Sequence, residues 1–206
     1  MIWSIKMLKK LFVSFSYIFH PVFISFYAVL FSIYFGQKDL SSSQKFDLLF
    51  YTILYTFCIP IAFIYVLKVI KKANSVMLYT ISERKIPLFF QLILTFVLFQ
   101  KIYTIDYLPE IHYFFVASFF SIFIAFVFLF LNIKTSLHLM AASGLLFFEI
   151  VVCIQNNSNI VGLIAVTFLV VVLVAISRLV LKAHTLQELF IGFLVGGAPQ
   201  FLSFYF

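Results

Sequence analysis

The chain has 206 residues, of which 65% are hydrophobic and only 10% are charged, and its formal net charge is +7. Soluble domains carry roughly one quarter charged residues, so this composition excludes a soluble globular protein and indicates an integral membrane protein. The positive charge is accounted for by the segments between apolar runs and does not require a basic surface for nucleic acid, so we expect no nucleic-acid partner.

Seven apolar runs follow one another along the chain. They cover about residues 11–35, 46–70, 87–104, 111–132, 136–154, 160–177 and 186–206. A membrane-spanning helix needs roughly 20 apolar residues, so the sequence predicts an all-α, polytopic transmembrane helical bundle of six or seven spans. The connections are short and leave no room for a soluble domain, so residues 1–206 are predicted to form a single transmembrane domain.

The first apolar run follows three lysines and superficially resembles a signal peptide. It is too long for the apolar part of a signal peptide, and no small-residue cleavage site follows it, so we expect it to remain as a membrane helix. His20-Pro21 lies within this run. The pair predicts a kink in which a polar group satisfies the carbonyl that proline leaves free; a catalytic His20 is the less favoured alternative.

The lysines and arginines are distributed unevenly between the two membrane faces that seven antiparallel spans would create. The face of the N-terminus holds most of them: Lys6, Lys9, Lys10, Lys68, Lys71, Lys72, Arg84, Lys85, Lys134, Arg178 and Lys182. The opposite face holds Lys38, Lys45 and Lys101. Because cytoplasmic loops are enriched in lysine and arginine, the sequence predicts that the N-terminus and the rich face are cytoplasmic.

Residues 177–188 gather an arginine, a histidine and a carboxylate where the last apolar run begins. Arg178 offers a planar guanidinium suited to phosphate oxygens. His184 and Glu188 are one helical turn apart, so the carboxylate can orient the imidazole as a nucleophile or base. A solvated or helix-capping histidine at the membrane interface is the alternative.

Two further groups of polar residues fall on the same predicted face. Arg84 and Lys85 come just before Pro87, which we expect to open the third span and to add the partial positive charge of a helix N-terminus. Lys134 and His138 lie four residues apart at the head of the fifth span, so they share one helix face. In the same span Ser143-Gly144 would allow a close approach of another helix. An ordinary cytoplasmic loop is the alternative for Arg84 and Lys85.

These residues resemble the membrane lipid-phosphate phosphatases of the type 2 phosphatidic acid phosphatase and vanadium haloperoxidase superfamily. That family carries three motifs, K-x6-R-P, P-S-G-H and S-R-x5-H-x3-D. The third is matched by Ser177, Arg178 and His184, with Glu188 in place of the aspartate. Arg84 precedes Pro87 by three residues instead of one, and Met77 stands where the first motif has lysine. Ser143-Gly144 keeps the centre of the second motif, flanked by Ala142 and Leu145. The similarity covers roughly residues 80–200.

The resemblance implies a phosphatase that needs neither metal nor cofactor. His184 would form a phosphohistidine, Glu188 would orient it, and His138 would replace the proton donor missing at Leu145. The implied phosphate-binding residues are Arg178, Arg84, Lys85, Lys134, Lys182, Ser143 and Gly144. The implied substrate is a phosphomonoester or pyrophosphate of a lipid or polyprenyl carrier, handled by an integral protein of the bacterial inner membrane.

Two alternatives stay open on function. A catalytically degenerate descendant could bind lipid phosphate or an anionic partner without turnover, and a structural or transport protein could use the charges only to set its topology. Within the fifth span, Glu149 is either a functional residue or a carboxylate that reaches the opposite interface by snorkelling. Cys58 and Cys153 lie inside apolar runs and are expected to be packed thiols, not a disulfide or a metal site.

Overall fold

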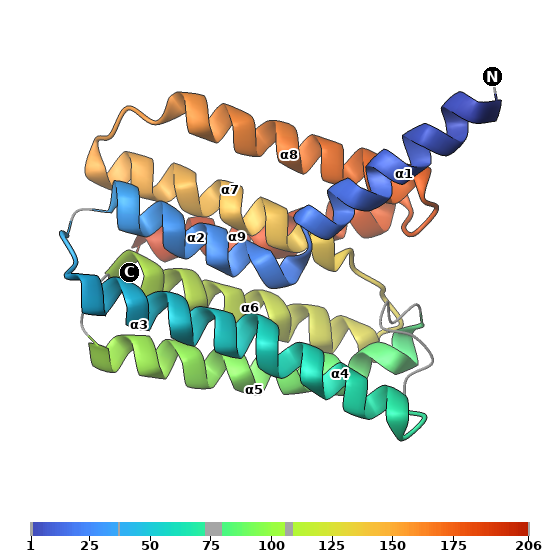
Figure 1. The fold of residues 1–206 in the computed structure, drawn as a ribbon, viewed down its shortest axis with the longest axis horizontal. Coiled ribbons are helices and arrows are strands. Elements are labelled where there is room, and N and C mark those ends of the chain that lie inside the picture. Colours follow the sequence, from blue (N-terminus) through green and yellow to red (C-terminus); the bar gives the residue numbers. More distant parts are fainter. Residues whose placement is uncertain (1, 37, 73–79, 106–108, 206) are drawn as a thin grey trace.

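The computed structural model describes residues 2–36, 38–72, 80–105 and 109–205, and these are helical with short connections. Figure 1 shows the helices lying roughly side by side in one bundle. The α-helices are α1 (Ile2–Ile18), α2 (Pro21–Phe35), α3 (Ser42–Ile53), α4 (Ile59–Val69), α5 (Ile81–Ile105), α6 (Pro109–Phe130), α7 (Leu137–Asn156), α8 (Val161–Val180) and α9 (Leu186–Leu202). A π-helical turn, η1 (Leu54–Cys58), joins α3 to α4, and a short 3-10 turn, η2 (Ser203–Tyr205), follows α9.

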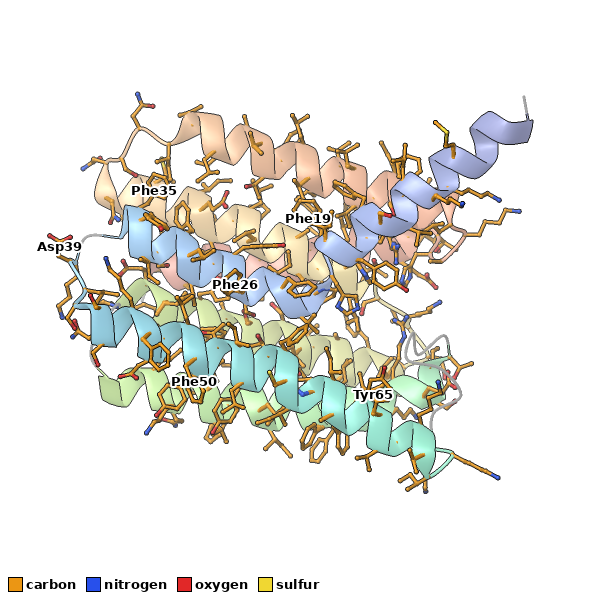
Figure 2. The ribbon with its side chains drawn as sticks, in the orientation of Figure 1. Phe19, Phe26, Phe35, Asp39, Phe50 and Tyr65 are labelled. Carbon is orange, nitrogen blue, oxygen red and sulfur yellow. The ribbon has the colours of Figure 1, made fainter. Side chains whose placement is uncertain are left out.

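The predicted class of helical membrane protein is confirmed. Among the described residues five helical runs are long and apolar enough to cross a membrane, and Ser42–Val69 counts as one of them. The pair formed by Lys9–Ile18 and Pro21–Phe35 would make a sixth span. Helix α9 is apolar but shorter, with 17 residues. Figure 2 shows Phe50 and Tyr65 on α3 and α4, and both side chains are exposed on the outside of the bundle, where lipid would cover them.

The predicted kink at His20-Pro21 is present. The axes of Lys9–Ile18 and Pro21–Phe35 differ by 54°. His20 caps the N-terminus of α2 through Nδ1, which accepts a hydrogen bond from the Val22 N–H at 3.4 Å, and Pro21 occupies the first helical turn. The Tyr27 hydroxyl donates to the carbonyl of Ile18 at 3.0 Å. Figure 1 shows α1 leaving the bundle past the end of α8.

The third span begins earlier than the sequence predicted. Helix α5 starts at Ile81, so Pro87 lies inside the helix instead of opening it. The cause is a reciprocal cap: the Glu83 N–H donates to Thr80 Oγ1 at 3.4 Å, and the Thr80 N–H donates to Glu83 Oε2 at 3.2 Å. The T-x-x-E spacing was readable in the sequence. Arg84 consequently lies in the first turn of α5.

Helices α7 and α9 pack closely along a seam of small residues, as Ser143-Gly144 predicted. A Cβ added at Gly196 would lie 1.9 Å from the backbone oxygen of Met140, and one added at Gly192 would lie 2.7 Å from the oxygen of Ser136. Ser143 Oγ donates to the carbonyls of Met140 and Phe193, at 3.1 and 3.0 Å. Close backbone approach of this kind is how helices associate where lipid supplies no hydrophobic drive.

Candidate functional site

The turn between α8 and α9 fixes His184 against Glu188. Lys182, just after α8, adopts a left-handed conformation with φ of 52°, and Thr185 begins α9 with a capping box. Glu188 Oε2 accepts the Thr185 N–H at 3.2 Å and contacts His184 Nδ1 at 2.7 Å. One carboxylate oxygen of Glu188 therefore caps the N-terminus of α9 and also orients the imidazole of His184. With the proton on Nδ1, the lone pair of His184 resides on Nε2.

The surroundings of His184 favour its neutral form. Its side chain is only 5% exposed. Burial lowers the pKa of His184 from 6.5 to about 4, and the positive charges of Arg84 and Lys134 act in the same direction. The hydrogen bond to Glu188 opposes this shift but does not outweigh burial. At neutral pH the imidazole is thus uncharged, the state in which a histidine can act as a nucleophile.

The segment before α7 forms hydrogen bonds with the first turn of α5 and with the turn between α8 and α9. Lys134 Nζ donates to the carbonyl of Ala183 at 3.2 Å, and Arg84 Nη1 donates to the carbonyl of Thr135 at 3.0 Å. The Ser136 N–H donates to the carbonyl of Glu188 at 3.2 Å. Residues from α5, the α6–α7 connection and the α8–α9 turn therefore meet at one end of the bundle, although they are far apart in the sequence.

A cavity of about 240 Å³ opens from this meeting point into the bundle. Its polar end is lined by His184, His138, Arg84 and His20. The rings of His20 and His138 meet edge to face with their centroids 4.9 Å apart. The sequence interpretation placed His184, His138 and Arg84 here but treated His20 mainly as a kink residue. Its signal was a histidine followed by a proline within the first apolar run.

Arg178 is buried beside this end of the cavity and is held by α1. Its Nη2 donates to Ser16 Oγ and, at 3.5 Å, to Ser177 Oγ. Ser16 and Ser177 are hydrogen-bonded at 2.6 Å, and Ser177 Oγ also donates to the carbonyl of Phe12 at 3.1 Å. The residues that line the cavity include His20 and His138, which lie within electrostatic range of Arg178, but do not include Arg178 itself. Ser16 had no distinguishing pattern in the sequence.

The remaining predicted phosphate-binding residues lie in other settings. Lys85 places Nζ 4.7 Å from the ring centroid of Phe130, on the side of α5 that faces α6. Lys182 is exposed in the turn after α8. Ser143 bonds to carbonyls within the α7–α9 seam, whereas Gly144 lines the cavity opposite Gly196.

Two other residues from the sequence interpretation are buried away from the polar end. Leu145, the counterpart of the second motif's histidine, is 6% exposed and belongs to the apolar core. Glu149 is 3% exposed and faces Thr167 of α8, so it does not reach the interface by snorkelling. Across the described ranges, no group of three or more His, Cys, Asp or Glu side chains could hold a metal ion. Both cysteines are free, Cys153 half-buried and Cys58 exposed on the outer surface instead of packed.

Comparison with known proteins yields no relative: no protein-family model, no curated protein and no solved structure matches this chain.

Proposed function

We propose that this protein is an integral membrane phosphatase that hydrolyses a phosphomonoester or pyrophosphate of a lipid or polyprenyl carrier. The observation that carries the proposal is the arrangement around His184. A neutral imidazole oriented by Glu188 lies with Arg84, His138 and His20 at the polar end of a cavity that is otherwise mainly apolar. Such a cavity suits a ligand with an anionic head and a hydrocarbon tail.

The chemistry follows from these residues. His184 Nε2 attacks phosphorus in line, a P–N bond forms, and the P–O bond to the leaving oxygen breaks. Arg84, which lines the cavity, offsets the charge that gathers on the phosphoryl oxygens, and Lys134 adds positive charge from outside the lining, within electrostatic range of His184. Positioning and electrostatics thus supply most of the rate. Protonated His138 gives the leaving oxygen its proton. The neutral His138 then takes a proton from the water that attacks phosphorus, and the P–N bond breaks to release phosphate and free His184.

The position of His138 supports a different reading of the second family motif. Thr135-Ser136-Leu137-His138 keeps the serine and the histidine of P-S-G-H, and Ser136 caps α7 so that His138 lies in its first turn. His138 itself would then correspond to the family's proton-donating histidine, and Leu145 would no longer be the residue to compare with it. Met77, at the lysine position of the first motif, lies outside the described residues.

Binding without turnover is the second candidate, and Arg178 favours it. A guanidinium that is hydrogen-bonded to Ser16 and Ser177 is held within the protein, next to the cavity lining. A protein that holds the phosphate through Arg84, without the Arg178 guanidinium on the reacting phosphoryl group, would bind lipid phosphate and react slowly or not at all.

The proposed topology has seven spans, counting α9, in the bacterial inner membrane, with the N-terminus and the cavity's polar end cytoplasmic. A reporter fused to the C-terminus should be active only outside the cytoplasm. Activity restricted to the cytoplasm would contradict this arrangement.

The test of the enzyme is phosphate release by the purified protein from short-chain phosphatidic acid and from a polyprenyl diphosphate, without added divalent metal. We expect release by the wild type and a loss of at least about 10⁴-fold in His184→Ala. Gln187→Ala, an exposed neighbour in the same turn, is the matched control and should keep full activity. If no variant releases phosphate but the wild type binds the lipids and Arg84→Ala weakens binding, the second candidate replaces the first.

A further inference from the structure

The cavity extends far beyond its polar end. Its lining starts at His184, in the turn before α9, and continues on α9 through Gly196 to Gln200. The fourteen residue steps of helix from Leu186 to Gln200 correspond to about 21 Å, which is most of a bilayer core of about 30 Å. Along α5 the lining reaches from Arg84 to Thr95, about 16 Å deeper into the bundle. The space is therefore a deep shaft among α2, α5, α6, α7 and α9.

The shaft is narrow and its walls accept hydrocarbon. The cavity volume of about 240 Å³ is spread over this depth. Two of the hydroxyls that line it donate to carbonyls of their own helices: Thr95 to Gln91 at 2.9 Å and Ser121 to Ala117 at 3.1 Å. With their protons used in this way, these side chains offer small surfaces that do not demand a polar ligand. Gly144 and Gly196 add no side chain at all.

Gln200 lines the shaft near the C-terminal end of α9. Its side chain is 1% exposed, and Nε2 donates to the carbonyl of Phe114 at 3.0 Å and to Ser118 Oγ at 3.2 Å. These bonds join α9 to α6 across the shaft. A chain that descends from the polar end therefore meets a fixed cross-link before it reaches the opposite membrane face.

We infer that the shaft takes the tail of a single-chain lipid phosphate, such as an alkyl or polyprenyl phosphate, and that Thr95, Ser118 and Gln200 limit the tail length. This inference rests on the proposed phosphate site and adds the class of carrier. The tail runs inside the bundle instead of in the surrounding lipid. A diacyl phosphate would place one chain in the shaft and leave the second in the surrounding lipid.

A photoreactive probe tests where the tail lies. The probe is a hexadecyl phosphonate with a diazirine at the chain end, which binds like a phosphate but cannot be hydrolysed. Protein in bilayer nanodiscs is illuminated, and the labelled residues are identified by peptide mass spectrometry. We expect label on α6 near Phe114 and Ser118 and on α9 near Gln200. Label confined to lipid-facing side chains such as Phe120 and Phe123 would overturn the inference.

Thr95→Phe should block the shaft, because Thr95 is 3% exposed and lines it. We expect deep labelling to fall at least tenfold while the affinity for butyl phosphonate stays within twofold. Val97→Phe adds a similar volume on the lipid-facing side of α5, where Val97 is 40% exposed, and should leave labelling unchanged. Ser118→Phe places a second block on α6 in case Thr95→Phe does not fold. Deep labelling that survives both blocks would contradict the shaft.

Inorganic phosphate separates the two levels of the proposal. If excess phosphate reduces labelling, but the residues labelled in its absence face the lipid, the phosphate site stands and the tail inference fails. If phosphate does not displace the probe and no cavity residue is labelled, the proposed phosphate site fails as well. Labelling by a diacyl phosphonate of equal chain length, at the same deep residues and with equal efficiency, would contradict the single-chain class.

Discussion

Two stretches of α7 and its cap carry the same kind of residues but do different things. Ser136 to His138 starts the helix at the basic end of the bundle, and His138 faces the cavity beside His20 and His184. Ala142 to Leu145 lies one to two turns further on. There Ser143 bonds to backbone carbonyls across the seam with α9, and Leu145 is packed in the core.

The difference shows how a short motif is read correctly or wrongly. A serine next to a glycine matches the family motif in sequence, but the same pair also suits the close packing of two helices in a membrane. What separates the two stretches is depth: the first turn of α7 lies at the end of the bundle that carries Arg84, Lys134 and His184. The experiments below test that division, from the largest expected effect to the smallest.

Loss of His138 should have the largest effect. In His138→Ala the rate of phosphate release should fall by about 10² to 10⁴, the usual contribution of a general acid or base. The measurement is kcat/KM with short-chain phosphatidic acid, and the matched control is His112→Ala, whose histidine bonds to the Phe99 carbonyl outside the cavity. An unchanged kcat/KM in His138→Ala would remove this residue from the reaction.

The lowered pKa of His184 predicts how the free energy of unfolding depends on pH. The unfolded chain protonates His184 near pH 6.5, the folded protein only near pH 4. Between these values the unfolded state binds the extra proton, so acidification removes about 3 kcal/mol of stability. Thermal unfolding in detergent from pH 7 to pH 4 should therefore show a steeper loss in the wild type than in His184→Gln. Parallel curves would mean that His184 is not held neutral.

The seam between α7 and α9 should respond to added volume. Gly196→Ala forces a Cβ to within 1.9 Å of the Met140 backbone oxygen, and overpacking of this kind costs about 1–3 kcal/mol. Gly162→Ala is the control, because no heavy atom lies within 4 Å of its added Cβ, and it should stabilise α8 by up to about 1 kcal/mol. Equal melting temperatures for the two variants would contradict the close approach of α7 and α9.

Ser143→Ala should have the smallest effect, and it distinguishes a role in helix packing from a role in the phosphate site. Removing the hydroxyl breaks the bond to the Phe193 carbonyl and should lower stability by about 1 kcal/mol, without changing kcat/KM by more than about twofold. Detergent unfolding and phosphate release on the same sample measure both. A tenfold loss of activity in a stable Ser143→Ala protein would return Ser143 to the phosphate site.

The sequence predicted the helical membrane class, the break at His20 and the place of His184 beside Glu188, because apolar length, proline and helical spacing act locally. It did not predict that α5 begins at Ile81, because the cap formed by Thr80 and Glu83, and not Pro87, decides where this helix begins. Ser16 on Arg178 and the cross-link from Gln200 to Phe114 could not be foreseen. Both join segments separated by tens of residues, and only the packing of the bundle brings them together.

The central claim is that His184 is the nucleophile of a phosphate site, and trapping its covalent intermediate tests this most directly. Protein mixed with a lipid phosphate labelled at phosphorus is quenched in milliseconds and digested. The account predicts an alkali-stable, acid-labile label on the peptide that contains His184, absent from His184→Ala and increased in His138→Ala if water activation is also slowed. Phosphate release with no label on His184 at any quench time would contradict the account.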